Sequence, residues 1–190
     1  MPPFPRSLVV LLLMFTAVPV KAEVFDAVRV TISGGKSISG LRGQADTQAV
    51  QVELTRFLGP RTELGLALGA SHIWQPRSWF GDLYREGHEK ALAGSLTAIG
   101  RLSLRETARA RLYGEFGFGP MLATRKIPAA TSRFNFATEA GVGIEIQTRS
   151  RAALIASYRF SHISNGGRTS RNPGWNVSSL HLGVAFRSKR

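Results

Sequence analysis

Apolar residues alternate with polar or small residues along most of the chain after residue 23, and turn-forming residues interrupt the alternation repeatedly. Alternation with period two predicts β-strands with one apolar face, because successive side chains of a strand point to opposite sides. The chain holds eight apolar rows, so we expect eight strands. The rows are Val24, Val28, Val30, Ile32; Val50, Val52, Leu54; Leu64, Leu66, Leu68, Ala70; Leu92, Leu96, Ala98, Leu102, Leu104; Leu112, Phe116, Phe118; Phe134, Phe136, Val142, Ile144, Ile146; Leu154, Ala156, Tyr158, Phe160; and Leu180, Leu182, Val184, Phe186.

The other face of the expected strands carries charges of both signs, interleaved with Gly and Ala. An apolar exterior and a polar interior are typical of a membrane barrel, whereas a soluble lipocalin-like barrel has the reverse arrangement. The charges can pair inside a small barrel, but so large an apolar face would promote aggregation in water. The pattern therefore predicts an all-β fold, an eight-stranded antiparallel transmembrane up-and-down β-barrel. The charges expected inside are Arg29, Glu53, Glu63, Arg101, Arg111, Glu115, Glu139, Glu145 and Arg159.

Short and long connections alternate between the expected strands. Short periplasmic turns and long extracellular loops are typical of outer-membrane barrels. We expect aromatic residues near one long loop to anchor the barrel at the membrane interface. The turns fall near residues 59–61, 105–107 and 148–150, the loops near 34–47, 74–90, 120–132 and 164–175, and the aromatic anchors are Trp74, Trp79 and Phe80.

The first 22 residues have the features of a secretory signal peptide. Arg6 precedes an apolar stretch at residues 8–17, and Val20-Lys21-Ala22 provides small residues for cleavage before Glu23. We expect a signal peptide at residues 1–22 and one barrel domain at residues 23–190, with an N-terminal anchor as the alternative. No later apolar stretch is long enough for a spanning helix, so any membrane crossing must be made by strands.

The net charge indicates which kinds of partner are compatible with the chain, and the cysteine content excludes some kinds of chemistry. Loss of Arg6 and Lys21 with the signal lowers the net charge from +13 to +11. A basic excess is compatible with nucleic acid, but export argues against it and favours acidic lipid headgroups or lipopolysaccharide phosphates. The chain has no cysteine, which excludes disulfides, thiolate catalysis and cysteine-ligated zinc.

A candidate catalytic group stands at the end of the seventh apolar row. His162 and Ser164 are two residues apart, so they share the apolar face of the strand, and Asn165 follows at once. A histidine beside a serine can take its proton and make it a nucleophile, and Asn165 could donate a hydrogen bond to the oxyanion. No Asp or Glu follows Glu145, but Asn176 lies on the same face as Leu180 and can orient an imidazole. The spacing alone is weak evidence for catalysis.

The remaining three histidines have plainer explanations. His72 ends an apolar row at the membrane interface, His181 points inward and is expected to hydrogen-bond in the lumen, and His88 is expected to be solvated in a loop. With the N-terminus in the periplasm, odd-numbered strands run outward. The candidate site would then lie at the depth of the outer leaflet, which in a Gram-negative outer membrane is lipopolysaccharide.

The motif His162-x-Ser164-Asn165, followed by Asn172-Pro173-Gly174 and a final apolar strand, resembles the PagL family of outer-membrane lipid A 3-O-deacylases. The resemblance implies that Ser164 is the nucleophile, His162 its base and Asn165 part of the oxyanion hole, with Asn172 and Gly174 in supporting positions. In that family a carboxylate in the last strand completes the triad, and its place falls here on Asn176.

The amide at position 176 leaves three possibilities open. A Ser-His-Asn arrangement works, a carboxylate from another loop replaces the missing acid, or the enzyme is weak or inactive. The conceivable substitutes are Asp82, Glu86 and Glu89.

The resemblance implies hydrolysis of the ester that holds the 3-hydroxyacyl chain at the 3 position of lipid A, with no metal or organic cofactor. The expected partners are lipid A or lipopolysaccharide and outer-membrane lipids, without nucleic acid, and a homodimer is an open alternative to a monomer. Arg168 and Arg171 are candidates for binding lipid A phosphates, with solvated loop charge as the alternative. Trp175 is expected at the headgroup level or against the glycan.

Two other functions compete with the esterase. One is a non-catalytic outer-membrane barrel that binds lipopolysaccharide or serves a structural role, and the other is a soluble periplasmic barrel that binds a lipid.

Overall fold

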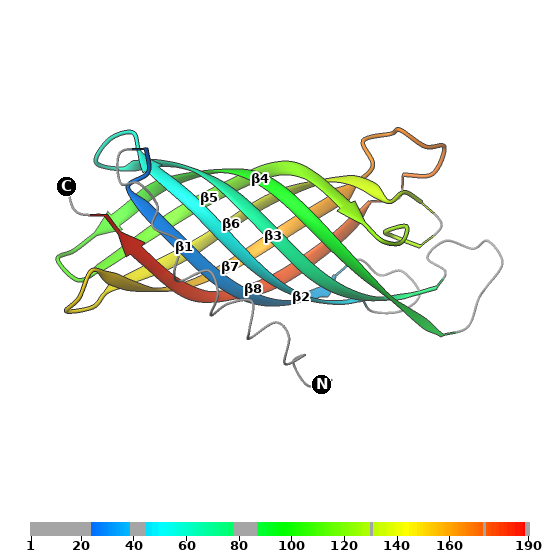
Figure 1. The fold of residues 1–190 in the computed structure, drawn as a ribbon, viewed down its shortest axis with the longest axis horizontal. Coiled ribbons are helices and arrows are strands. Elements are labelled where there is room, and N and C mark those ends of the chain that lie inside the picture. Colours follow the sequence, from blue (N-terminus) through cyan, green and yellow to red (C-terminus); the bar gives the residue numbers. More distant parts are fainter. Residues whose placement is uncertain (1–23, 39–44, 78–86, 130, 173, 189–190) are drawn as a thin grey trace.

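The computed structural model is a closed barrel of eight antiparallel strands, in which each strand pairs with its neighbours in sequence and β1 closes onto β8 (Figure 1). It describes residues 24–38, 45–77, 87–129, 131–172 and 174–188; the expected signal peptide, Trp79 and Phe80 lie outside them. The eight-stranded up-and-down barrel expected from the alternation is confirmed. The strands are β1 (Ala27–Ser37), β2 (Asp46–Phe57), β3 (Thr62–Pro76), β4 (His88–Glu106), β5 (Ala110–Ala123), β6 (Phe134–Gln147), β7 (Ala152–Ser164) and β8 (Trp175–Arg187).

The apolar rows of the strands form the outer face of the barrel. Side chains that a soluble protein would bury are open here; Leu68 is 66% exposed and Leu122 is 63% exposed. Such a belt around a closed barrel belongs in lipid, and it rules out the lipocalin-like arrangement. Other exposed members of the belt are Leu64, Leu66, Leu92, Leu96, Leu102, Leu104, Leu112, Phe116, Phe118, Val142, Ile144, Ile146, Leu154, Tyr158, Phe160, Leu180, Leu182 and Phe186.

Charged side chains fill the middle of the barrel, and all nine that were expected inside pair there with an opposite charge. Glu145 accepts hydrogen bonds from Arg29 at 2.9 Å, Arg111 at 3.1 Å and Arg187 at 2.7 Å. Buried ions are tolerated only when partners of opposite charge replace water. The mutual pairing therefore explains why alternating charges are compatible with a barrel whose outside is apolar.

An apolar cluster fills the barrel at the end where β1, β3, β5 and β7 end, which we call the long-loop end. Its largest member is Trp175, whose side chain is fully buried beside Ile73, Ile127 and Ile163. The headgroup-level position expected for Trp175 is therefore wrong. Since neighbouring residues of a strand point to opposite sides, burying Trp175 directs Asn176 outward.

The alternation of tight and long connections is confirmed, but the strands are longer than expected. β3 and β4 extend into the loop expected at residues 74–90. His88 is consequently the first residue of β4 rather than a loop residue, exposed and with its ring 4.5 Å from that of Trp74. His181 faces the lumen as expected, with Nε2 2.9 Å from the Ser179 hydroxyl. No described segment forms a helix long and apolar enough to cross a membrane.

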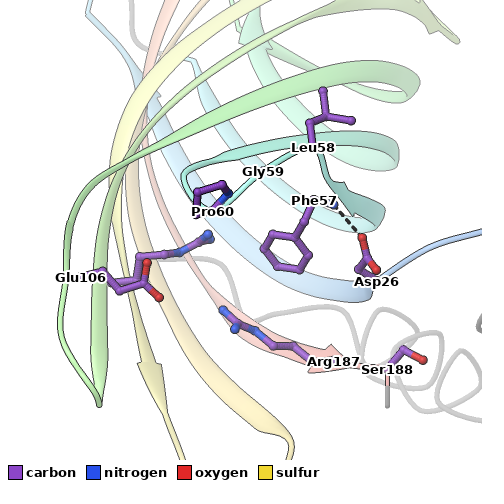
Figure 2. A pocket seen from close by; sticks show the side chains of 9 residues that line it. Asp26, Phe57, Leu58, Gly59, Pro60, Glu106, Arg187 and Ser188 are labelled. Carbon is purple, nitrogen blue, oxygen red and sulfur yellow. Dashed lines mark hydrogen bonds between the residues drawn. The ribbon is translucent and has the colours of Figure 1, made fainter. Parts of the chain in front are cut away.

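A hollow of about 710 Å³ lies at the opposite, short-turn end of the barrel (Figure 2). At the edge of the hollow, the guanidinium of Arg187 lies 5.4 Å from the ring centre of Phe57. The Phe57 N–H donates to the Asp26 carboxylate at 2.7 Å. These contacts tie the end of β8 to the start of β1 and the end of β2. The hollow is separated from His162 by the length of the barrel, so it is not part of the candidate site.

Candidate active site

The end of β7 pairs with the start of β8, and this register places His162 opposite Asn176. The two side chains meet on the lipid face, where His162 Nδ1 lies 2.7 Å from Asn176 Oδ1. An amide oxygen can only accept, so the contact assigns the proton to Nδ1 and leaves Nε2 as the basic nitrogen. The inward neighbours, Ile163 and Trp175, are paired in the apolar cluster and fix this orientation.

Ser164 ends β7 on the same face as His162, half-buried and opposite Phe136 of β6. Within the described part of the chain, its hydroxyl makes no hydrogen bond, and none joins it to His162. Catalytic hydrogen bonds are often long in ligand-free enzymes and shorten when substrate binds. The structure thus brings a serine and a histidine to one lipid-facing surface without yet joining them.

Asn165 organises the loop that joins β7 to β8. Its buried side chain donates to the Thr169 hydroxyl at 2.7 Å and to the Arg171 carbonyl at 2.8 Å, and accepts from the Gly167 N–H at 2.9 Å. Its own N–H donates to the Asn172 side chain at 3.0 Å. Asn165 was expected to donate one hydrogen bond to the oxyanion, but both hydrogens of its side-chain amide are engaged within the loop. Sequence reasoning missed Thr169 and Gly167, although Asn followed by two glycines is a turn signal.

Gly174 lies against the imidazole of His162. Its φ is +67°, a conformation that side-chain-bearing residues rarely adopt, and a Cβ built on it would lie 2.6 Å from His162 Cε1. Only glycine lets the backbone approach the ring this closely. Asn172 accepts the hydrogen bond from the Asn165 N–H, and Gly174 leaves room for the imidazole of His162. Both residues of the Asn-x-Gly motif therefore have a structural role.

The basic residues of the same loop differ in placement. Arg168 is exposed, with its guanidinium 5.1 Å from the ring centre of Phe134, and Arg171 is exposed further along the loop. Trp175, enclosed in the lumen, has no surface open to lipid or sugar.

None of the carboxylates that the structure describes is bonded to His162. Glu89 instead accepts from Gln75 at 3.0 Å and pairs with Arg125 at 3.6 Å, and Asp82 and Glu86 lie outside the described residues. No group of three or more His, Asp or Glu side chains is placed to hold a metal ion in residues 24–38, 45–77, 87–129, 131–172 and 174–188.

Several solved structures share the barrel fold of this chain. Neisserial surface protein A matches with a TM-score of 0.61 and 15% identity, covering 85% of this chain and 96% of that chain. The outer-membrane enzyme PagL matches with a TM-score of 0.56 and 16% identity, covering 80% and 97%. Ail, the attachment invasion locus protein of Yersinia pestis, matches with a TM-score of 0.50 and 14% identity, covering 87% and 100%. The protein thus has the closed β-barrel fold of these three proteins.

The family is shown by sequence. The model of the lipid A 3-O-deacylase (PagL) family matches residues 58–185, which is more than half of the chain and includes His162, Ser164 and Asn176. The chain belongs to this family, whose members are outer-membrane proteins of the lipid A deacylase type. No protein with a curated description matches the chain by sequence.

Proposed function

We propose that this protein is a lipid A 3-O-deacylase, a serine esterase that removes the ester-linked 3-hydroxyacyl chain at position 3 of lipid A. One observation carries the proposal: a hydrogen-bonded His162–Asn176 pair stands beside Ser164 on the lipid face, where the ester of a membrane lipid can reach it. Family membership supplies the substrate class. The reaction takes place in the outer leaflet of a Gram-negative outer membrane.

The chemistry has two halves. Ser164 Oγ bonds to the ester carbonyl carbon while its proton passes to His162 Nε2, and the carbonyl electrons move onto oxygen. Collapse of this intermediate breaks the carbon–oxygen bond to the sugar, and His162 returns the proton to the sugar oxygen. Water, deprotonated by His162, then attacks the acyl group on Ser164. The 3-hydroxy fatty acid is released and the serine regenerated.

Asn176 holds the histidine without a charge. Its oxygen keeps Nδ1 protonated and Nε2 basic, as the acid of a serine triad does, but it cannot neutralise the imidazolium that forms. An ionised carboxylate at the lipid boundary carries a desolvation penalty that an amide avoids. An amide in place of the carboxylate therefore lowers the rate of hydrolysis but retains the orientation of His162.

Substrate contacts come from the loop between β7 and β8. Asn165 contributes to the oxyanion hole after one of its bonds, to Thr169 or to the Arg171 carbonyl, is exchanged for the substrate oxygen. The exposed guanidiniums of Arg168 and Arg171 bind the lipid A phosphates through charge-assisted hydrogen bonds.

The second candidate function is a non-catalytic outer-membrane barrel that binds lipopolysaccharide. The amide at position 176 favours it, since a binding protein needs no triad.

Release of 3-hydroxy fatty acid from lipid A in detergent micelles separates the two candidates. The purified barrel is compared with Ser164→Ala and with Ser178→Ala, a change at another serine on the lipid face of β8. The esterase predicts release by the unaltered barrel and by Ser178→Ala, but none by Ser164→Ala. A folded barrel that releases no fatty acid supports the binding protein.

A further inference from the structure

The two sides of the candidate site differ in chemical character. On the side of β6 and β5, the residues around Ser164 and His162 are mostly aromatic, with the small Thr138 and Ala140 between the rings. Ser164 pairs with Phe136, and the next outward pairs are His162 with Thr138 and Phe160 with Ala140. One strand further, Phe118 and Phe116 face Thr138 and Ala140. We call Phe116, Phe118, Phe134, Phe136 and Phe160 the aromatic flank.

The aromatic flank is ordered by ring contacts that reach the loop. Phe118 and Phe136 stack with ring centres 5.6 Å apart, and Phe134 meets Phe136 edge-on at 5.2 Å. Arg168 lies over Phe134, which puts a positive charge at the long-loop end of the flank. A cation above an apolar surface matches a lipid that has an anionic headgroup above its acyl chains.

Small side chains lie between the rings. Thr138 and Ala140 of β6 are bordered by Phe116 and Phe118 on β5 and by His162 and Phe160 on β7. Phe116 is 56% and Phe160 41% exposed, so both rings present surface to lipid. From the level of Ser164 to Ala140 is four residues, about 13 Å at the rise of a strand. An acyl chain whose carbonyl is at Ser164 can lie over this strip.

The opposite side of the site is polar. The Tyr158 hydroxyl lies 2.6 Å from the Ser178 hydroxyl on the lipid face, and Lys36 of β1 pairs with Ser178 in the sheet. These groups lie next to the His162–Asn176 pair on the lipid face, further from the long-loop end. An acyl chain on this side would cover hydroxyl groups and an ammonium group, which costs free energy.

We propose that the acyl chain to be cleaved lies along the aromatic flank over β6, between Phe118 and Phe160, with the anionic headgroup beside Arg168. This assignment rests on the proposed function and deepens it, because it identifies the residues that contact the leaving acyl chain and sense its length. Ala140 lies where the far part of that chain passes.

Substitution of the strip tests the assignment. Ala140→Phe places a ring in the strip between Phe116 and Phe160, while Ala70→Phe makes the same change on the lipid face of β3 across the barrel. Ser178→Phe adds the same ring to the polar side. The probes are lipid A with a 3-hydroxydecanoyl or a 3-hydroxymyristoyl chain at position 3, compared by kcat/KM in micelles. Heat-modifiable gel mobility verifies that each variant is folded.

Ala140→Phe is expected to lower kcat/KM for the longer chain about tenfold more than for the shorter one, because the added ring displaces only the far methylenes. Ala70→Phe and Ser178→Phe should leave the ratio unchanged. Equal loss for both chains, no loss for either, or a changed ratio in Ser178→Phe overturns the assignment. A folded unaltered barrel that cleaves neither lipid overturns the proposed function itself, a result distinct from all of these.

Discussion

Gly174→Ala tests whether the loop after Ser164 positions His162, the proposed catalytic base. An alanine Cβ would lie 2.6 Å from His162 Cε1 and 3.2 Å from Nε2, so the ring must move by about 1 Å to reach ordinary contact. The His162–Asn176 bond of 2.7 Å would lengthen beyond hydrogen-bonding range. A misplacement of about 1 Å in a catalytic group can cost about 100-fold in rate, so we expect kcat to fall by about that factor.

Gly167→Ala is the matched control for this change. Gly167 has a similar positive φ of +75°, but a Cβ there meets nothing within 4 Å. Both substitutions therefore carry the same backbone strain, about 1–2 kcal/mol, and only Gly174→Ala displaces the imidazole. Fatty acid release is measured in micelles for both variants, with heat-modifiable mobility as the check of folding.

The expected result is a folded Gly174→Ala barrel with strongly reduced kcat and a Gly167→Ala barrel that stays within a few-fold of the unaltered protein. The histidine ring signals in an NMR spectrum should shift in the first variant only. Equal losses in both variants would assign the effect to backbone strain. Full activity of Gly174→Ala would refute the positioning role.

Three further changes probe the site and the barrel. Asn176→Asp should raise kcat about 10-fold or more, measured by fatty acid release, because it adds the charge that stabilises imidazolium while keeping Nδ1 protonated; an unchanged rate counts against this explanation of the amide. Asn165→Ala should lower kcat about 100-fold and make the loop susceptible to protease, since three side-chain bonds are lost, while the barrel keeps its unfolding midpoint in urea. Glu145→Ala should destabilise the barrel by about 3–5 kcal/mol, because it removes the buried carboxylate that accepts hydrogen bonds from Arg29, Arg111 and Arg187. Glu139→Ala, at a single 3.2 Å pair with Arg159, should cost less in the same urea titration.

Most of the barrel could be predicted because the alternation of inward and outward residues is visible within each strand. A strand between lipid and lumen must alternate, so inward charges such as Glu145 and outward residues such as Leu68 are readable from period two. The limits of the strands were less readable. The pairing of β3 with β4 extends beyond the apolar rows, as far as Pro76 of β3 and His88 of β4, so both strands reach into the expected loop.

The candidate site could be predicted only in part. His162, Ser164 and Asn176 share a face by strand periodicity, and the register of β7 with β8 brings the histidine and the amide together. The same periodicity directs Trp175, the neighbour of Asn176 in β8, to the inner face of the strand. The expected interfacial position was instead based on the general preference of tryptophan for membrane interfaces. The contact between Gly174 and His162 depends on the fold of the loop, which no periodic pattern encodes.

The mass spectrum of lipid A tests most directly whether Ser164 is the nucleophile of a working deacylase. The chain is expressed in a bacterial outer membrane beside Ser164→Ala, and both barrels are checked for folding. Lipid A from the membrane with the unaltered barrel should lose one 3-hydroxyacyl mass from the 3 position, and lipid A from the Ser164→Ala membrane should not. Identical, fully acylated lipid A from both membranes, with both barrels folded, would contradict it.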